Sequence, residues 1–306
     1  MSLFLNSNAQ LRSGWKFGIY VVFFLLIWFA TGIALTFLVV PRNLTLIHDE
    51  LGILELNAIA LFVPAVAAML LTVRFTDHRP LRTFGIGFLP NRRSNVLYGL
   101  SVSAGMLGLV IAGCYAFGYV SMHWTGNKVP ARTLLATFNV LVFSALNEEL
   151  VFRGFPLQVL IEGVGEWPAI VGFSALFGAI HLNNPNATYL GTLNTVVAGI
   201  LLSLAYIRTR SLWTSYALHV GWNVGLGFIF GFPLSGLDIA SLWTTGIAGN
   251  EKILGGGYGP EGGLLATFIF GAAAVIVNRH GSDNPIQASA GGSPGRDHRD
   301  RAANPR

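Results

Sequence analysis

Long apolar stretches separated by short polar loops run along almost the whole chain. Most of them reach the roughly 20 residues that an α-helix needs to cross the hydrocarbon core of a bilayer. This pattern predicts eight spans, at residues 17–40, 56–73, 96–120, 130–163, 168–182, 189–207, 212–233 and 262–278. We therefore expect an all-α, polytopic membrane protein with about eight transmembrane helices.

The polar segments divide the chain into four parts. Residues 1–129 hold the first three predicted spans, and residues 130–232 hold spans four to seven. Residues 233–278 combine a Gly-rich loop, 234–261, with the last span. Residues 279–306 are polar and basic, with Pro, Gly and Ser, a composition that predicts a disordered tail.

Composition agrees with a membrane protein. Hydrophobic residues make up 53% of the 306 residues and charged residues 11%, against roughly 25% charged in soluble domains. The 37 glycines and seven tryptophans also fit, because small residues let membrane helices approach and Trp favours the interface. The single cysteine, Cys114, excludes an intrachain disulfide and a two-cysteine metal site.

The net charge of +5 follows the membrane topology. With eight spans both termini lie on one side, and the loops on that side hold most of the basic residues. Those on the other side are Arg42, Lys128, Arg132 and Lys252. The positive-inside rule therefore places both termini in the cytoplasm. We expect the lipid bilayer as a partner and no nucleic acid, in a cell membrane that we take to be a bacterial inner or plasma membrane.

Two adjacent acids, Glu148 and Glu149, interrupt the apolar fourth span. Ionisable groups at membrane depth are costly and usually mark function. Glu149 and Arg153 are four residues apart and share a helix face, whereas Glu148 points about 100° away. One acid can thus be held by the arginine while the other serves as a general acid or base. Anchoring of helix packing and proton or ion transport are the alternatives.

Two later spans carry polar residues of a second kind. His181 closes the fifth span with Phe177 one turn earlier, and His219 and Asn223 lie four apart on the seventh. An imidazole can bind a metal, accept a proton or donate to an oxyanion, and an amide can donate to an oxyanion. A helix cap at His181 and an interhelical hydrogen bond between His219 and Asn223 are the structural alternatives.

Together these side chains resemble the site of a known family. A carboxylate, two imidazoles and an amide can activate a water and stabilise an oxyanion without a Ser or Cys nucleophile. The chain contains neither GxSxG nor HExxH. It resembles the CPBP family of intramembrane proteases, which includes CAAX prenyl endopeptidases and bacterial bacteriocin-processing or self-immunity relatives. The family motifs EExxxR, FxxxH and HxxxN/D are matched by Glu148-Glu149 with Arg153, Phe177 with His181, and His219 with Asn223.

The resemblance implies an intramembrane endopeptidase that cleaves a peptide or protein tail, with or without a lipid modification. Glu148 and His181 would activate the water, Glu149 and Arg153 would support the site, and His219 with Asn223 would contact the oxyanion. Glu148, His181 and His219 are also candidate zinc ligands with an open water position. The enzyme is thus expected to be a metalloprotease or a glutamate-dependent endopeptidase.

The acids, the histidines and Asn223 can meet at one site only if the helices that carry them are suitably placed. In a ladder of perpendicular helices His181 would lie far from Glu148, so the fifth span must be short, tilted or offset. Two other functions stay open from the sequence: a non-catalytic membrane chaperone or immunity protein of the same family, and an ion-coupled transporter. The natural substrate and the oligomeric state are open as well.

Overall fold

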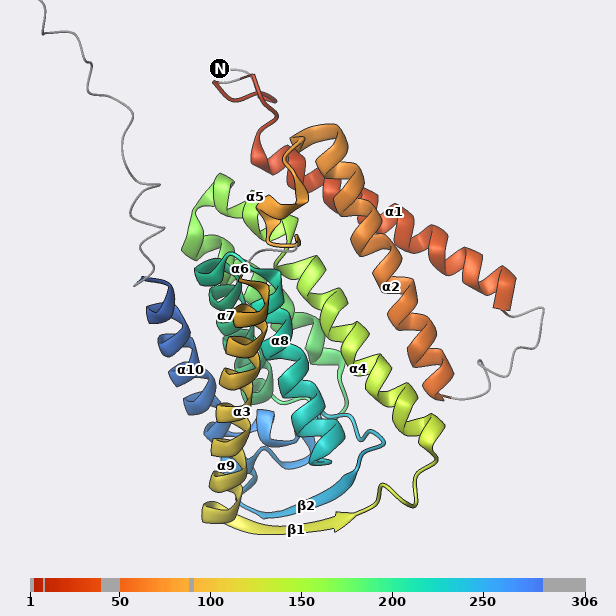
Figure 1. Ribbon diagram of the computed structural model, residues 1–306, viewed down its shortest axis with the longest axis vertical. Helices are drawn as coiled ribbons and strands as arrows, with labels where there is room; N and C mark the ends of the chain where they lie inside the picture. Colours follow the sequence, from red (N-terminus) through yellow and green to blue (C-terminus); the bar gives the residue numbers. More distant parts are fainter. Residues whose placement is uncertain (1–2, 8, 40–49, 88–90, 283–306) are drawn as a thin grey trace, which may run out of the picture.

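The protein is a bundle of helices with a small two-stranded sheet at the end opposite its N-terminus (Figure 1). The computed structural model describes residues 3–7, 9–39, 50–87 and 91–282. The helices are α1 (Ser13–Val39), α2 (Glu50–Thr72), α3 (Arg92–Phe117), α4 (Ala131–Phe152), α5 (Phe155–Val164), α6 (Glu166–Ile180), α7 (Tyr189–Thr209), α8 (Leu212–Asn223), α9 (Glu251–Leu254) and α10 (Leu264–Ser282). The strands are β1 (Gly118–Trp124) and β2 (Trp243–Gly249).

Within the described residues, five helical segments are long and apolar enough to cross a bilayer, at residues 13–37, 55–77, 92–117, 131–164 and 189–209. The helix Leu264–His280 is a shorter apolar helix. Two other predicted spans are not among these five: α6 has 15 residues, and α8 has 12 before the chain continues as a π-helical turn over Val224–Ile229. The apolar helices are those of a multi-pass membrane protein, but the predicted count of about eight spans is not confirmed.

The sheet corrects the all-α prediction. Strands β1 and β2 pair antiparallel, with Gly118 opposite Gly249 and Trp124 opposite Trp243. The start of β1 lies in the predicted third span, and β2 lies in the predicted Gly-rich loop 234–261. Both assignments were wrong because strand pairing satisfies backbone N–H and C=O groups through a partner far away in the sequence.

The predicted fourth helix is broken in two. The chain leaves the helical conformation at Gly154, and α5 begins with Phe155 and Pro156. Proline lacks a backbone N–H and is tolerated in the first turn of a helix, where that donor has no intrahelical partner. The apolar pattern continues through the break, so the pattern alone predicted one helix to about residue 163. The break ends α4 at Phe152, three residues after Glu149.

Two predicted polar segments lie partly outside the described residues. The loop expected between the first and second spans includes residues 40–49, and the structure describes the chain again from Glu50, where α2 begins. Of the predicted tail 279–306, the first four residues continue α10 to Ser282. The rest of that tail, residues 283–306, lies outside the described part.

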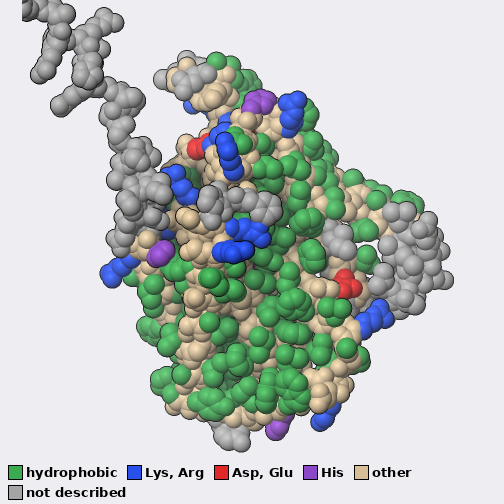
Figure 2. All heavy atoms as spheres, in the orientation of Figure 1, with side chains coloured by type: hydrophobic (Ala, Val, Ile, Leu, Met, Phe, Trp, Pro, Cys, Tyr) green, Lys and Arg blue, Asp and Glu red, His purple; other side chains and the backbone are tan. Residues whose placement is uncertain are grey.

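Hydrophobic side chains cover much of the outside of the bundle. In Figure 2 they occupy most of the visible face, and most of the visible Lys and Arg side chains lie nearer the N-terminal end. Phe29 on α1 is 70% exposed and Phe268 on α10 is 74% exposed. Large apolar surfaces of this kind are expected where lipid replaces water as the solvent.

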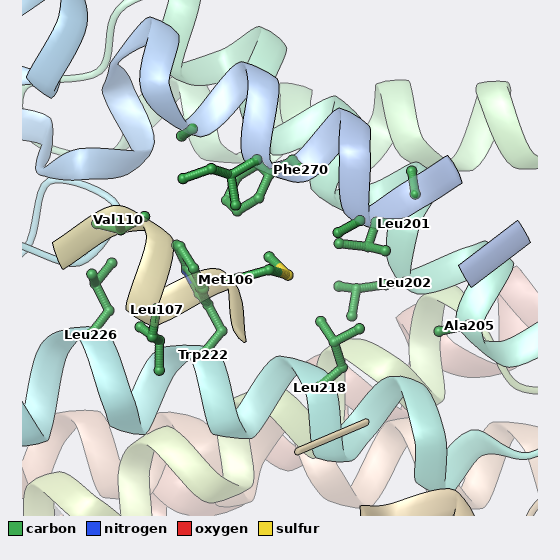
Figure 3. Close-up of a cluster of buried hydrophobic side chains, with 14 of the residues drawn as sticks. Met106, Leu107, Val110, Leu201, Leu202, Ala205, Leu218, Trp222, Leu226 and Phe270 are labelled. Carbon is green, nitrogen blue, oxygen red and sulfur yellow. The ribbon is translucent and has the colours of Figure 1, made fainter. Parts of the chain in front are cut away.

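The largest buried cluster lies between α3, α7, α8 and α10. Figure 3 shows Met106, Leu202 and Leu218 pointing toward one another from three of these helices, with Trp222 and Phe270 beside them. The rings of Trp222 and Phe270 meet edge to face at 5.0 Å. This packing fixes α8, the helix that carries His219 and Asn223, against the rest of the bundle.

The contact between α3 and α8 generates a stability prediction. A Cβ at Gly99 would lie 2.4 Å from the backbone oxygen of Thr214, whereas a Cβ at Gly105, on the same helix, would meet nothing within 4 Å. Gly99→Ala should therefore lower the free energy of unfolding by about 1–3 kcal/mol through overpacking. Gly105→Ala should leave it unchanged or raise it by up to ~1 kcal/mol, because Ala favours helix.

Thermal unfolding of both variants in detergent, followed by intrinsic fluorescence, measures this difference. An equal midpoint for the two variants would contradict the close approach of α3 and α8.

Candidate active site

The two adjacent acids of α4 lie in opposite environments. The Glu149 side chain is 0% exposed, whereas 29% of the Glu148 side chain is exposed. Consecutive helical residues differ by about 100° in direction, so one carboxylate points into the bundle while the other borders a cavity. Glu149 is therefore the buried acid of the pair and Glu148 the partly exposed one.

Arg153 forms a buried ion pair with Glu149, as the four-residue spacing predicted. Its Nη1 donates to Glu149 Oε1 at 3.1 Å, and its Nη2 donates to the backbone oxygen of Gly199 on α7 at 3.3 Å. Its guanidinium carbon lies 4.5 Å from the centre of the Phe177 ring on α6. The arginine thus connects the acid on α4 to two further helices.

His219 on α8 joins the same cluster. Its Nδ1 lies 2.9 Å from Glu149 Oε1, and its Nε2 lies 3.7 Å from Glu148 Oε2. An ionised carboxylate only accepts hydrogen bonds, so Nδ1 is the donor in the contact with Glu149. That bond directs Nε2 toward Glu148 and the cavity. Asn223, one turn after His219 on α8, borders the cavity too.

His181 directly follows α6 and is oriented by its own backbone. Its Nδ1 lies 2.7 Å from the backbone oxygen of Phe177. A carbonyl oxygen only accepts, so Nδ1 is the donor, and in the neutral imidazole Nε2 keeps its lone pair. The Phe177 ring lies 4.7 Å from the His181 ring and 6.2 Å from the His219 ring, measured between ring centres. The FxxxH spacing therefore packs one aromatic ring against both imidazoles.

A single cavity of about 280 Å³ brings these side chains together. Its polar lining includes Glu148, His181, His219 and Asn223. Its apolar lining includes Met106, Leu201, Leu202 and Leu218 from α3, α7 and α8 (Figure 3). His181, at the end of the 15-residue helix α6, borders the same cavity as Glu148. Glu149 and Arg153 lie behind this lining and support it.

Residues 130–225 match the family model of the type II CAAX prenyl endopeptidases, described as Rce1-like. This segment belongs to the CPBP family of intramembrane proteases. The match extends from Pro130, just before α4, to Gly225, just after α8, and so contains all six predicted site residues. No curated protein matches the chain.

Zinc at Glu148, His181 and His219 stays a prediction from the CPBP resemblance. Among the residues that the structure describes, no three His, Cys, Asp or Glu side chains gather closely enough to hold a metal ion. Nδ1 of His219 is engaged by Glu149, and Nδ1 of His181 by the Phe177 backbone. Glu148, His181 and His219 all border the cavity.

Among the other residues that border this cavity are Asn184, Trp222, Ser235 and Glu261, which the sequence pattern did not mark as site residues. Trp222 lies between the His219 and Asn223 positions, where an indole is typical of ordinary membrane-helix packing. Glu261 lies in the Gly-rich run before α10, outside the matched segment. A carboxylate directly before an apolar helix was the available signal, and it also fits an ordinary loop.

The buried ion pair generates the second prediction. Arg153→Met removes the cation from a fully buried carboxylate, which should lower the free energy of unfolding by about 3–5 kcal/mol. The double variant Glu149→Gln/Arg153→Met should regain part of this loss, because no uncompensated charge stays buried. Denaturant unfolding in mixed micelles gives these values.

Arg208→Met is the matched control. Arg208 pairs with Glu166 at 2.6 Å, but these side chains are 17% and 34% exposed. Loss of a partly exposed pair should cost only about 0–1 kcal/mol. A loss for Arg153→Met no larger than that of the control would show that Glu149 is solvated.

Proposed function

We propose that the protein is an intramembrane endopeptidase. It hydrolyses a peptide bond in a membrane-associated protein or peptide tail with a water activated by glutamate and histidine. The observation that carries this proposal is the meeting of Glu148, His181, His219 and Asn223 at one largely apolar cavity beside a buried Glu149–Arg153 pair. Membership of residues 130–225 in the CPBP family supports it independently.

Glu148 and His181 activate the water in this proposal. Glu148 is the acid that is not engaged by Arg153, and Nε2 of His181 has a lone pair that can accept a hydrogen bond from the water. The water oxygen attacks the scissile carbonyl carbon while one of its protons passes to Glu148. The same proton then moves to the leaving amine as the C–N bond breaks, so that Glu148 acts first as base and then as acid.

His219 and Asn223 stabilise the oxyanion that forms in between. Nε2 of His219 is directed to the cavity by the contact of Nδ1 with Glu149, and when protonated it donates to the oxyanion. The Asn223 amide supplies a second donor from the same helix. Donors of this kind in a site shielded from water contribute about 2.7–4 kcal/mol to the transition state when measured singly.

The apolar lining favours a substrate segment that arrives from the bilayer. Met106, Leu202 and Leu218 offer no charge to a bound chain, and the described residues that line the cavity include no Lys or Arg. The segment is a peptide or protein tail, with or without a lipid modification. In this proposal the enzyme spans the cell membrane several times, with both termini in the cytoplasm.

Comparative proteomics of membrane peptides tests the proposed function. Cells that express the wild type should contain new peptide termini that are absent from cells expressing Glu148→Ala at equal membrane abundance. Glu251→Gln, on the short helix α9 and exposed, is the control and should reproduce the wild-type peptides. Identical termini in the wild-type and Glu148→Ala cells would rule out a Glu148-dependent protease.

Asn223→Ala gives a quantitative test on the substrate that this comparison identifies. Loss of one oxyanion donor should lower kcat by about 10²–10³-fold with a small change in KM. Purified protein in bilayer nanodiscs allows both constants to be measured. An unchanged kcat, or a loss expressed only in KM, would remove Asn223 from the oxyanion site.

A further inference from the structure

Glu261 is a second buried acid at the wall of the cavity. Its residue is 9% exposed, and it borders the cavity together with Glu148. It belongs to the Gly-rich segment between β2 and α10, outside the matched residues 130–225. A buried carboxylate in apolar surroundings is costly unless its oxygens receive hydrogen bonds.

Both oxygens of Glu261 receive such bonds. Oε1 accepts from the indole Nε1 of Trp222 at 2.7 Å. Oε2 accepts from the backbone N of Ser235 at 2.6 Å and from its Oγ at 2.8 Å. An indole N–H and a backbone N–H can only donate, so the site demands an acceptor on each side of this residue. A side chain with one acceptor and one donor cannot satisfy both.

The first partner of Glu261, Trp222, lies next to Asn223, one of the proposed oxyanion donors. Trp222 directly precedes Asn223 on α8, and its ring packs edge to face on Phe270 of α10. The bond from Trp222 to Glu261 therefore fixes the rotation of the last turn of α8. That rotation decides where the Asn223 amide points.

The second partner of Glu261, Ser235, is connected to the segment that carries His181. Ser235 belongs to a tight turn in which the backbones of Leu234 and Leu237 exchange two hydrogen bonds of 2.9 Å. The backbone oxygen of Ser235 accepts from Nδ2 of Asn184 at 3.0 Å. Asn184 ends the short helical turn that starts at His181. Glu261 thus connects, through a small number of hydrogen bonds, the segments that carry Asn223 and His181.

The backbone around Glu261 is anchored as well. Nδ2 of Asn194, a buried residue of α7, donates to the backbone oxygens of Glu261 and Gly263 at 2.7 and 2.9 Å. A rigid backbone leaves the carboxylate little freedom to follow a shift of its partners. The position of Glu261 therefore dictates the positions of Trp222 and Ser235.

We propose that Glu261 is a positioning residue of the active site, holding Trp222 and the Leu234–Leu237 turn so that Asn223 and His181 face one cavity. The inference rests on the proposed function and extends it to a segment beyond the matched residues. It assigns the Gly-rich segment a role as a fixed wall of the active site. Glu261 acts through its two partners and does not itself exchange a proton with the substrate.

Glu261→Gln is the informative substitution. The amide keeps the shape of the carboxylate but directs an NH₂ group at either the Trp222 indole or the Ser235 backbone N–H. We expect kcat to fall about tenfold or more, because small displacements of catalytic groups cost up to ~10²-fold. KM should change little, since both carboxylate oxygens are occupied by protein donors. Rates are compared per mole of folded, monodisperse protein, so that lost protein does not count as lost turnover.

A double-variant cycle separates this role from general stability. Trp222→Phe removes the indole N–H, so the amide introduced by Glu261→Gln can turn its NH₂ there in the double variant and accept from Ser235 with its oxygen. The loss of kcat in Trp222→Phe/Glu261→Gln should therefore be smaller than the product of the losses in the two single variants. Trp213→Phe is the control: it lies on the same helix, and its Nε1 donates to the backbone oxygen of Gly87 at 3.3 Å, so its effect should simply multiply with that of Glu261→Gln.

The unfolding midpoints of the same single and double variants can be measured without a substrate. Non-additive midpoints with Trp222→Phe and additive midpoints with Trp213→Phe are expected. Additive effects in both pairs, or a wild-type kcat for Glu261→Gln, would overturn the positioning role. If the wild type shows no Glu148-dependent cleavage, the proposed function fails and the catalytic role of Glu261 fails with it. If the unfolding midpoints are still non-additive in that case, Glu261 stabilises the packing of Trp222 and Ser235 but has no role in catalysis.

Discussion

The buried carboxylate of Glu149 joins three helices of the bundle. It lies on α4, pairs with Arg153 just after that helix, and meets His219 of α8 at 2.9 Å, while Arg153 also reaches the backbone of Gly199 on α7. Charges shielded from water interact strongly and are costly when left alone. The arrangement is therefore stable only when all the partners are in place. This requirement links the packing of the helices to the orientation of the imidazole at the cavity.

The two neighbouring acids of α4 therefore differ in their partners and in their exposure. Glu149 is occupied by a cation and an imidazole, so Glu148 is the acid of the pair that borders the cavity. Phe177 packs against both imidazoles and against the guanidinium of Arg153, which places one aromatic ring at the centre of the three motifs. These groups lie on helices or directly at their ends, which limits the freedom of each side chain to move.

Local spacing was enough to predict some of this site. The pairing of Glu149 with Arg153 follows from four residues on one helix, and the position of Asn223 relative to His219 follows in the same way. The contact of His219 with Glu149 joins residues 70 positions apart and depends on how α4 packs on α8. Hydrophobic periodicity contains no information on how two distant helices pack. The prediction that these residues meet at one site therefore depended on the resemblance to the family motifs.

The fold shows the same limit. Apolar runs located the long helices well, because a helix that meets lipid has to be apolar over its length. They failed at Gly154, where hydrophobicity continues although the helix does not, and at β1, whose partner lies more than a hundred residues further on. Glu261 was missed for the same reason. Its hydrogen-bond partners, Trp222 and Ser235, are distant in the sequence and lie next to it only in the folded chain.

Proximity of Glu148 and His219 is the central claim, and cross-linking measures it without any substrate. In a Cys114→Ser background, Glu148→Cys/His219→Cys in membranes is treated with a short bifunctional methanethiosulfonate and analysed by peptide mass spectrometry. We expect a cross-link between the peptides of α4 and α8, and much less with Glu148→Cys/Trp213→Cys, whose second cysteine lies near the start of α8. No link between positions 148 and 219, or equal linking in both pairs, would contradict a shared active-site cavity.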